Sequence, residues 1–161
     1  MDFQERLQKA IERGQRNRDV AAREAAARAM SEEECRRLHS KYRLELTEHI
    51  ETCLRQLADQ FPGFKYESIL ADTGWGSAVS RDDVNLARGR GRSSLYSRLE
   101  MVVPPLGKYH VLALSAKGTI RNKELFSRSH YQQLAEIDLD SFREVIDLWV
   151  LEYAEQFAGQ S

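Results

Sequence analysis

Apolar residues recur at helical spacing in two segments of the 161-residue chain. From Cys35 onward they form one stripe with a period of 3.6 residues, which is typical of an amphipathic helix. Its members are Cys35, Leu38, Tyr42, Leu46, Ile50, Cys53 and Leu57. In the second segment Asp138 is the predicted N-cap, Ile137 and Phe142 have the spacing of a hydrophobic staple, and Gly159 ends the pattern. Both segments are predicted to be helices that cover a core.

Residues 2–30 are rich in strong helix formers but carry few large apolar side chains. Phe3, Leu7 and Ile11 recur every four residues and form a short apolar edge, while alanine dominates beyond residue 20. A helix of this composition is either solvated or packs closely through its alanines against another helix. We therefore expect a helical extension that is suited to self-association.

A capping box interrupts the helical pattern, because Ser31 as N-cap would place Glu34 at position N3. Residues 1–61 therefore form either one continuous helix or two. The domain organisation that follows is a helical extension over residues 1–30 and a single α+β domain over residues 31–161.

The middle of the chain alternates between apolar and polar residues, which predicts strands over residues 65–73 and 77–86. Residues 95–120 then read as a central hairpin with a tight turn at residues 104–107. The apolar face of its second strand continues through Gly118 to Ile120 and Phe126, so one long strand bent at the glycine is favoured over a turn at Lys117-Gly118. Residues 119–127 are left open as strand or loop.

The predicted fold class is thus α+β, with about four antiparallel strands. A long N-terminal helix, or two helices, precedes the sheet, and a C-terminal helix packs on one sheet face. The composition is that of a globular protein, with 42% hydrophobic and 30% charged residues and a net charge of −1. No apolar run is long enough for a membrane span, and the N-terminus lacks an apolar signal core. We expect a cytoplasmic protein with no membrane partner.

Charge is unevenly distributed. Residues 81–128 contain 10 Lys and Arg against 4 Asp and Glu, whereas residues 129–161 contain 1 against 7. The glycine-rich composition of residues 88–94 predicts a loop, whose arginines are suited to contact phosphate groups, and later basic residues would extend that surface. The candidate residues for nucleic-acid or phosphate binding are Arg88, Arg90, Arg92, Arg121, Lys123 and Arg128. The alternative is that the basic sheet and the acidic helix pair with each other inside the fold.

The middle helix carries two pairs of cysteine and histidine four residues apart, Cys35 with His39 and His49 with Cys53. Four-residue spacing on a helix lets two side chains share one metal ion. The two cysteines lie about 27 Å apart along one helix, too far for a disulfide. Two chains packed antiparallel would instead bring the pairs together as Cys₂His₂ sites across a dimer. The alternative is two reduced, buried cysteines.

No catalytic motif is present, since the sequence has no nucleophile elbow, phosphate-cradling loop or paired-carboxylate signature. No cofactor is expected. The leading interpretation is a non-enzymatic interaction or accessory protein that self-associates through its helices, as a homo-oligomer or with a protein partner. One alternative is a nucleic-acid or phosphate-ligand binder that uses residues 88–128. Another is a small enzyme with a site near His110 or His130.

Overall fold

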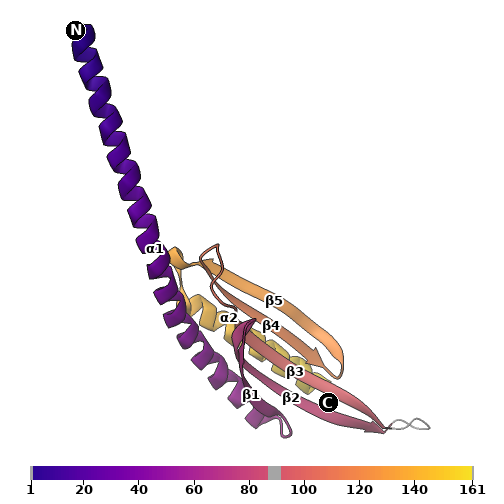
Figure 1. Ribbon diagram of the computed structural model, residues 1–161. Coiled ribbons are helices and arrows are strands. Elements are labelled where there is room, and N and C mark those ends of the chain that lie inside the picture. Colours follow the sequence, from indigo (N-terminus) through magenta and orange to yellow (C-terminus); the bar gives the residue numbers. More distant parts are fainter. Residues whose placement is uncertain (1, 87–91, 161) are drawn as a thin grey trace. The chain divides into compact units, whose positions relative to one another are not determined.

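The computed structural model describes the backbone of residues 2–86 and 92–160, and the side chains of these residues except 26–31, 85, 86, 92 and 93. The helices are α1 (Phe3–Gln60), the short 3-10 helix η1 (Leu134–Glu136) and α2 (Leu139–Gly159). The strands are β1 (Lys65–Ala71), β2 (Gly74–Leu86), β3 (Arg92–Val103), β4 (Val111–Ile120) and β5 (Lys123–Gln133). The α+β prediction is confirmed, with five strands instead of about four (Figure 1).

The chain divides into two compact units, Met1–Arg37 and Leu38–Ser161. In the first unit the backbone is helical from Phe3 onward, and α1 continues without interruption through Ser31. Every side chain of residues 2–25 is exposed to solvent. The apolar edge of Phe3, Leu7 and Ile11 is therefore uncovered in this unit.

In the second unit a five-stranded antiparallel meander is covered on one face by α2 and by α1 from residue 38 onward (Figure 1). The strand order β1-β2-β3-β4-β5 means that each strand pairs with its neighbours in sequence. The predicted stripe of α1 supplies Leu46, Ile50 and Leu57 to the core, together with Leu54. Phe142, Ile146, Tyr153 and Phe157 of α2 complete the helical side of the core, which meets apolar residues of β3 and β4.

The opposite face of the sheet is open and polar. Arg98 lies there between two carboxylates, with its guanidinium 2.6 Å from Glu67 and 3.2 Å from Glu100. A shallow hollow of about 280 Å³ on this face is lined by Tyr96, Arg98, Glu100, Lys117 and Thr119. Leu99 and Met101 on the other face of β3 are fully buried, so the predicted alternation of apolar and polar residues is confirmed for this strand.

The strand prediction is confirmed as far as Ile120 and was wrong beyond it. β4 continues through Gly118 instead of turning at Lys117-Gly118, but the chain then turns back at Arg121 and Asn122 to form the hairpin of β4 and β5. Both turn residues have positive φ, 49° and 69°, as a two-residue primed hairpin turn requires. Asn122 tolerates this conformation and is held by β3, since its side chain accepts from Tyr96 N at 2.9 Å and donates to Ser94 O at 2.8 Å.

Gly118 still marks an irregularity, because the β4–β5 register shifts between Gly118 and Thr119. A Cβ at Gly118 would lie 3.2 Å from the rings of Phe126 and Tyr153. The glycine therefore permits close packing between the strand pair and α2, and β4 continues past the register shift to Ile120.

Two boundaries also differ from expectation. Residues 92–94 were predicted to be loop but open β3, paired with β2 at Leu86, Asn85 and Val84. The connection after Val103 is longer than a tight turn, because β4 begins only at Val111. The start of α2 is as predicted: Asp138 is the N-cap, and its side chain accepts from Ser141 N at 3.3 Å.

Candidate functional site

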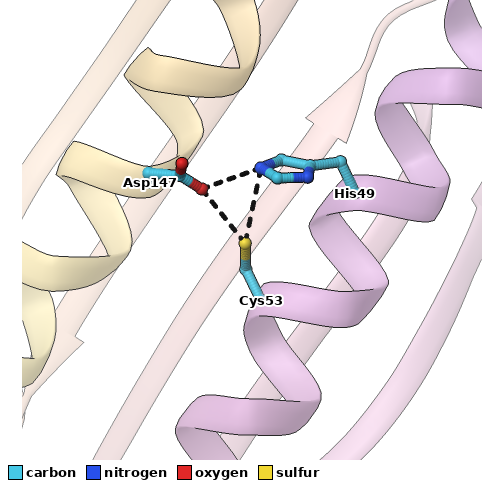
Figure 2. A group of neighbouring side chains, drawn as sticks. All are labelled: His49, Cys53 and Asp147. Carbon is cyan, nitrogen blue, oxygen red and sulfur yellow. Dashed lines mark hydrogen bonds and ion pairs between the residues drawn. The ribbon is translucent and has the colours of Figure 1, made fainter.

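Three side chains that are able to bind a metal converge between α1 and α2 in the second unit (Figure 2). His49 and Cys53 extend from one face of α1, because residues four apart lie one above the other on a helix. Asp147 reaches toward them from the neighbouring turn of α2. The three donor atoms lie within 4.8 Å of one another. Among the described residues, these are the only three or more His, Cys, Asp or Glu side chains whose donor atoms lie this close together.

The donor atoms face a common point. His49 Nε2 lies 2.7 Å from Asp147 Oδ1 and 3.6 Å from Cys53 Sγ. The Cys53 thiol donates to Asp147 Oδ1 at 3.4 Å. The same imidazole nitrogen therefore faces both the thiol and the carboxylate. A relay of the Cys-His-Asp type instead uses one ring nitrogen toward the nucleophile and the other toward the carboxylate.

The Cys53 thiol is held in its protonated form. Burial raises its pKa to about 12, and both the hydrogen bond to Asp147 and the negative charge of that carboxylate act in the same direction. The thiolate is the nucleophilic form of cysteine, so a thiol with this pKa is unreactive at neutral pH. The geometry and the protonation state together support convergent binding at this site over nucleophilic attack by Cys53.

The raised pKa makes the stability of the protein depend on alkaline pH. The thiol of the unfolded chain ionises near its ordinary pKa of 9, whereas the folded thiol does so near 12. Above pH 9 the unfolded state binds fewer protons than the folded state, so the free energy of unfolding decreases as pH rises through this interval. We expect urea denaturation between pH 8 and 10.5 to show a steeper decline for the unmodified protein than for Cys53→Ser.

The matched control for that comparison is Cys35→Ser, which removes the other cysteine of the chain and leaves Cys53 in place. Its decline should parallel that of the unmodified protein. Identical pH dependence in the unmodified protein and in Cys53→Ser would contradict the assignment of a protonated thiol in this cluster.

A groove of about 560 Å³ leads away from the cluster along the two helices. Cys53 and Asp147 form part of its wall, and its apolar surface comes from Leu57 of α1 with Val150 and Leu151 of α2. Leu151 is 63% exposed, and Asp147 is also exposed. Solvent and small ligands therefore have direct access to the carboxylate and thiol side of the cluster.

The predicted metal ligands divide into two groups. His49 and Cys53 belong to the cluster, and Asp147 joins them from a position 94 residues beyond Cys53. His39 is 3% exposed, and burial and the nearby charge of Arg43 lower its pKa, although a hydrogen bond with the backbone of Pro104 opposes this. Cys35 is partly exposed. The four-ligand site across a dimer stays a prediction.

The basic residues proposed to contact nucleic acid have different environments. Arg128 forms a two-pronged ion pair with Glu152 of α2, which is the internal pairing of basic sheet and acidic helix considered above. Arg121 is the first residue of the β4–β5 turn, and Lys123 follows that turn as the first residue of β5. Arg88 and Arg90, and the side chain of Arg92, lie outside the described residues. Nucleic-acid binding by residues 88–128 stays a prediction.

The two histidines near which an alternative enzymatic site was predicted lie in different elements, His130 in β5 and His110 in the connection before β4. His130 packs edge-on against Phe142, with ring centroids 4.8 Å apart, and lies 3.3 Å from the Gln132 side chain. His110 has a positive φ of 52° in the connection before β4, where its carbonyl accepts from Leu134 N at 3.0 Å. Both contacts are typical of structural roles.

Comparison with known proteins gives no assignment: no family model matches the chain, and no curated protein or solved structure is significantly similar to it. Among the described residues, no helix has both the length and the apolar character that crossing a membrane requires.

Proposed function

We propose that the protein is a non-enzymatic, self-associating interaction protein, and that two copies pair through the helix formed by residues 3–25. The observation that carries the proposal is the uncovered apolar edge of this helix. Phe3, Leu7 and Ile11 are 76%, 47% and 46% exposed, and every neighbouring side chain is exposed as well. A helix with so little contact of its own gains stability when an apolar face is buried against another helix.

The same edge continues with small residues. Ala21 and Ala25 come eighteen residues after Phe3 and Leu7, which is five full helical turns. An antiparallel pair of these helices, in the register where residue numbers on the two copies sum to 32, sets Leu7 against Ala25 and Ile11 against Ala21. Large side chains then meet small ones at both ends of the pair, as ridges meet grooves between packed helices.

The middle of this register has the same complementarity. Gly14 and Arg18 lie on the edge and oppose each other across the two-fold axis, so the absent side chain of the glycine leaves room for the arginine stem. A Cβ at Gly14 would meet nothing within 4 Å in the chain itself, so the space is open. Because residues 1–30 carry 7 basic and 5 acidic groups, no strong field selects an oppositely charged partner. A second copy of the chain suits this edge.

The test is sedimentation equilibrium of the full chain and of the variant Leu7→Ser/Ile11→Ser. We expect the unmodified chain to associate and the variant to be monomeric at the same concentration, because four large side chains leave the interface of each dimer. The matched control is Val20→Ser, since Val20 is 49% exposed on the opposite side of the same helix. This control should associate as the unmodified chain does.

Gly14→Leu provides a second measure, because the added side chain would collide with Arg18 of the other copy and weaken the pair. A chain that is monomeric at all concentrations, or one whose association is unchanged by Leu7→Ser/Ile11→Ser, would overturn the proposal. Equal weakening by Val20→Ser would show that the apolar edge is not the interface.

A further inference from the structure

We infer that His49, Cys53 and Asp147 form a zinc site within a single chain, with a fourth coordination position open to the groove between α1 and α2. The inference goes beyond self-association, because the cluster lies in the second unit and shares no residue with the proposed dimer edge. It starts from the convergence of three donor atoms of different types on one point (Figure 2).

The distances between the donor atoms fit tetrahedral zinc. Zinc bonds of about 2.0–2.1 Å to nitrogen and oxygen and about 2.3 Å to sulfur place the ligand atoms about 3.3–3.6 Å apart. The observed separations are 3.6 Å from Nε2 to Sγ and 3.4 Å from Sγ to Oδ1. The remaining one, from Nε2 to Oδ1, is 2.7 Å and would widen by about 0.6 Å as the hydrogen bond is replaced by two metal bonds.

The types of ligand select the metal. One thiolate, one imidazole and one carboxylate suit zinc better than calcium or magnesium, which prefer oxygen ligands alone. The doubly charged cation would meet two negative charges, one from Asp147 and one from the ionised Cys53. Three protein ligands plus one exchangeable position is the arrangement of zinc sites that bind water or a substrate. The exposed side of the cluster, where Asp147 and Leu151 border the groove, supplies that position.

Binding has a proton balance that can be measured. The Cys53 thiol gives up its proton when sulfur bonds to the metal, so each zinc that binds releases one proton to solvent. The titratable groups that face this thiol are His49 on its own helix and Asp147 on α2, and Asp59 lies in the same groove. The affinity should therefore rise with pH while the free thiol is protonated.

The experiment titrates the reduced full-length chain with zinc against a chromophoric chelator, and with cobalt as a spectroscopic probe. We expect one metal ion per chain, an affinity independent of protein concentration, and a thiolate-to-cobalt charge-transfer band in the near ultraviolet. The variants His49→Ala, Cys53→Ser and Asp147→Asn should each weaken zinc binding by about 100-fold or more, since even loss of an outer-shell partner costs 10–100-fold. Cys53→Ser should also lose the band and the pH dependence.

Cys35→Ser is the matched control, because it removes a cysteine of the same helix that does not belong to the cluster. Its affinity and spectrum should equal those of the unmodified chain. Far-ultraviolet circular dichroism of each variant verifies that the fold is retained, and Cys53→Ala serves if the serine variant fails to fold. Absence of zinc binding, an unchanged affinity in both Cys53 variants, or loss of binding in Cys35→Ser would overturn the site, and the last result would favour ligands shared across a dimer.

Discussion

Gly76→Ala is expected to destabilise the protein by about 3 kcal/mol or more, the largest effect expected for an added methyl group at any glycine that the structure describes. Gly76 lies in β2 opposite Val102 of β3. A Cβ built at this position would be 1.9 Å from the carbonyl oxygen of Met101 and 2.8 Å from the Val102 Cα. Both neighbours are backbone atoms, so no side-chain rotation relieves the clash and the β2–β3 pairing must move apart.

The measurement is the free energy of unfolding from urea denaturation, and the matched control is Gly107→Ala. A Cβ at Gly107 would meet nothing within 4 Å, so the control should be neutral or more stable by a few tenths of a kcal/mol, because alanine restricts the unfolded chain. Equal stability of the two variants would mean that β2 and β3 do not approach as closely as described at Gly76.

Tyr153→Ala should cost about 3–5 kcal/mol, as expected when a large aromatic side chain leaves a cavity. Tyr153 of α2 is fully buried and stacks on Phe157, with ring centroids 6.2 Å apart. Its hydroxyl donates to the carbonyl of Thr119 at 2.8 Å, next to the register shift in β4. The residue therefore joins the last helix to the centre of the sheet by both packing and a hydrogen bond.

Tyr153→Phe separates these two contributions. It keeps the ring but leaves the Thr119 carbonyl without its donor, which should cost about 1–2 kcal/mol. Burial raises the pKa of Tyr153 well above its ordinary value, so the hydroxyl stays a donor at neutral pH, and its hydrogen bond with Ser97 offsets only part of that rise. Urea denaturation of the two variants measures the difference, and equal losses would show that the ring contributes little.

The helices were predictable because their evidence is local. The stripe that contains Leu46, Ile50 and Leu57 repeats every turn, and Asp138 and Phe142 stand at fixed offsets from the start of α2. The alternation of Leu99 and Met101, both buried, with polar residues likewise predicts the strand that contains them. Each of these patterns requires only a few consecutive residues and one face turned to a core.

The features missed by sequence reasoning depend on residues far apart in the chain. The turn at Arg121-Asn122 lacks the glycine that usually marks a primed hairpin turn, and its asparagine is held instead by Tyr96 and Ser94 of β3. Asp147 was not recognised as a possible ligand because only the packing of α2 beside α1 brings it to Cys53. The four-residue spacing of His49 and Cys53 predicted two of the three ligands, but no local sequence pattern marks Asp147.

The consecutive strand order has a consequence for how the chain assembles as it is synthesised. Every pairing in the sheet joins strands that are neighbours in sequence, so each strand can pair with the preceding strand soon after it emerges from the ribosome. The apolar face of α1 around Ile50 is made first, yet Phe142 and Tyr153 of α2, which complete its side of the core, are made last. Until then the part of this face that α2 covers is an exposed apolar surface on a nascent chain, the kind of surface that holdase chaperones bind.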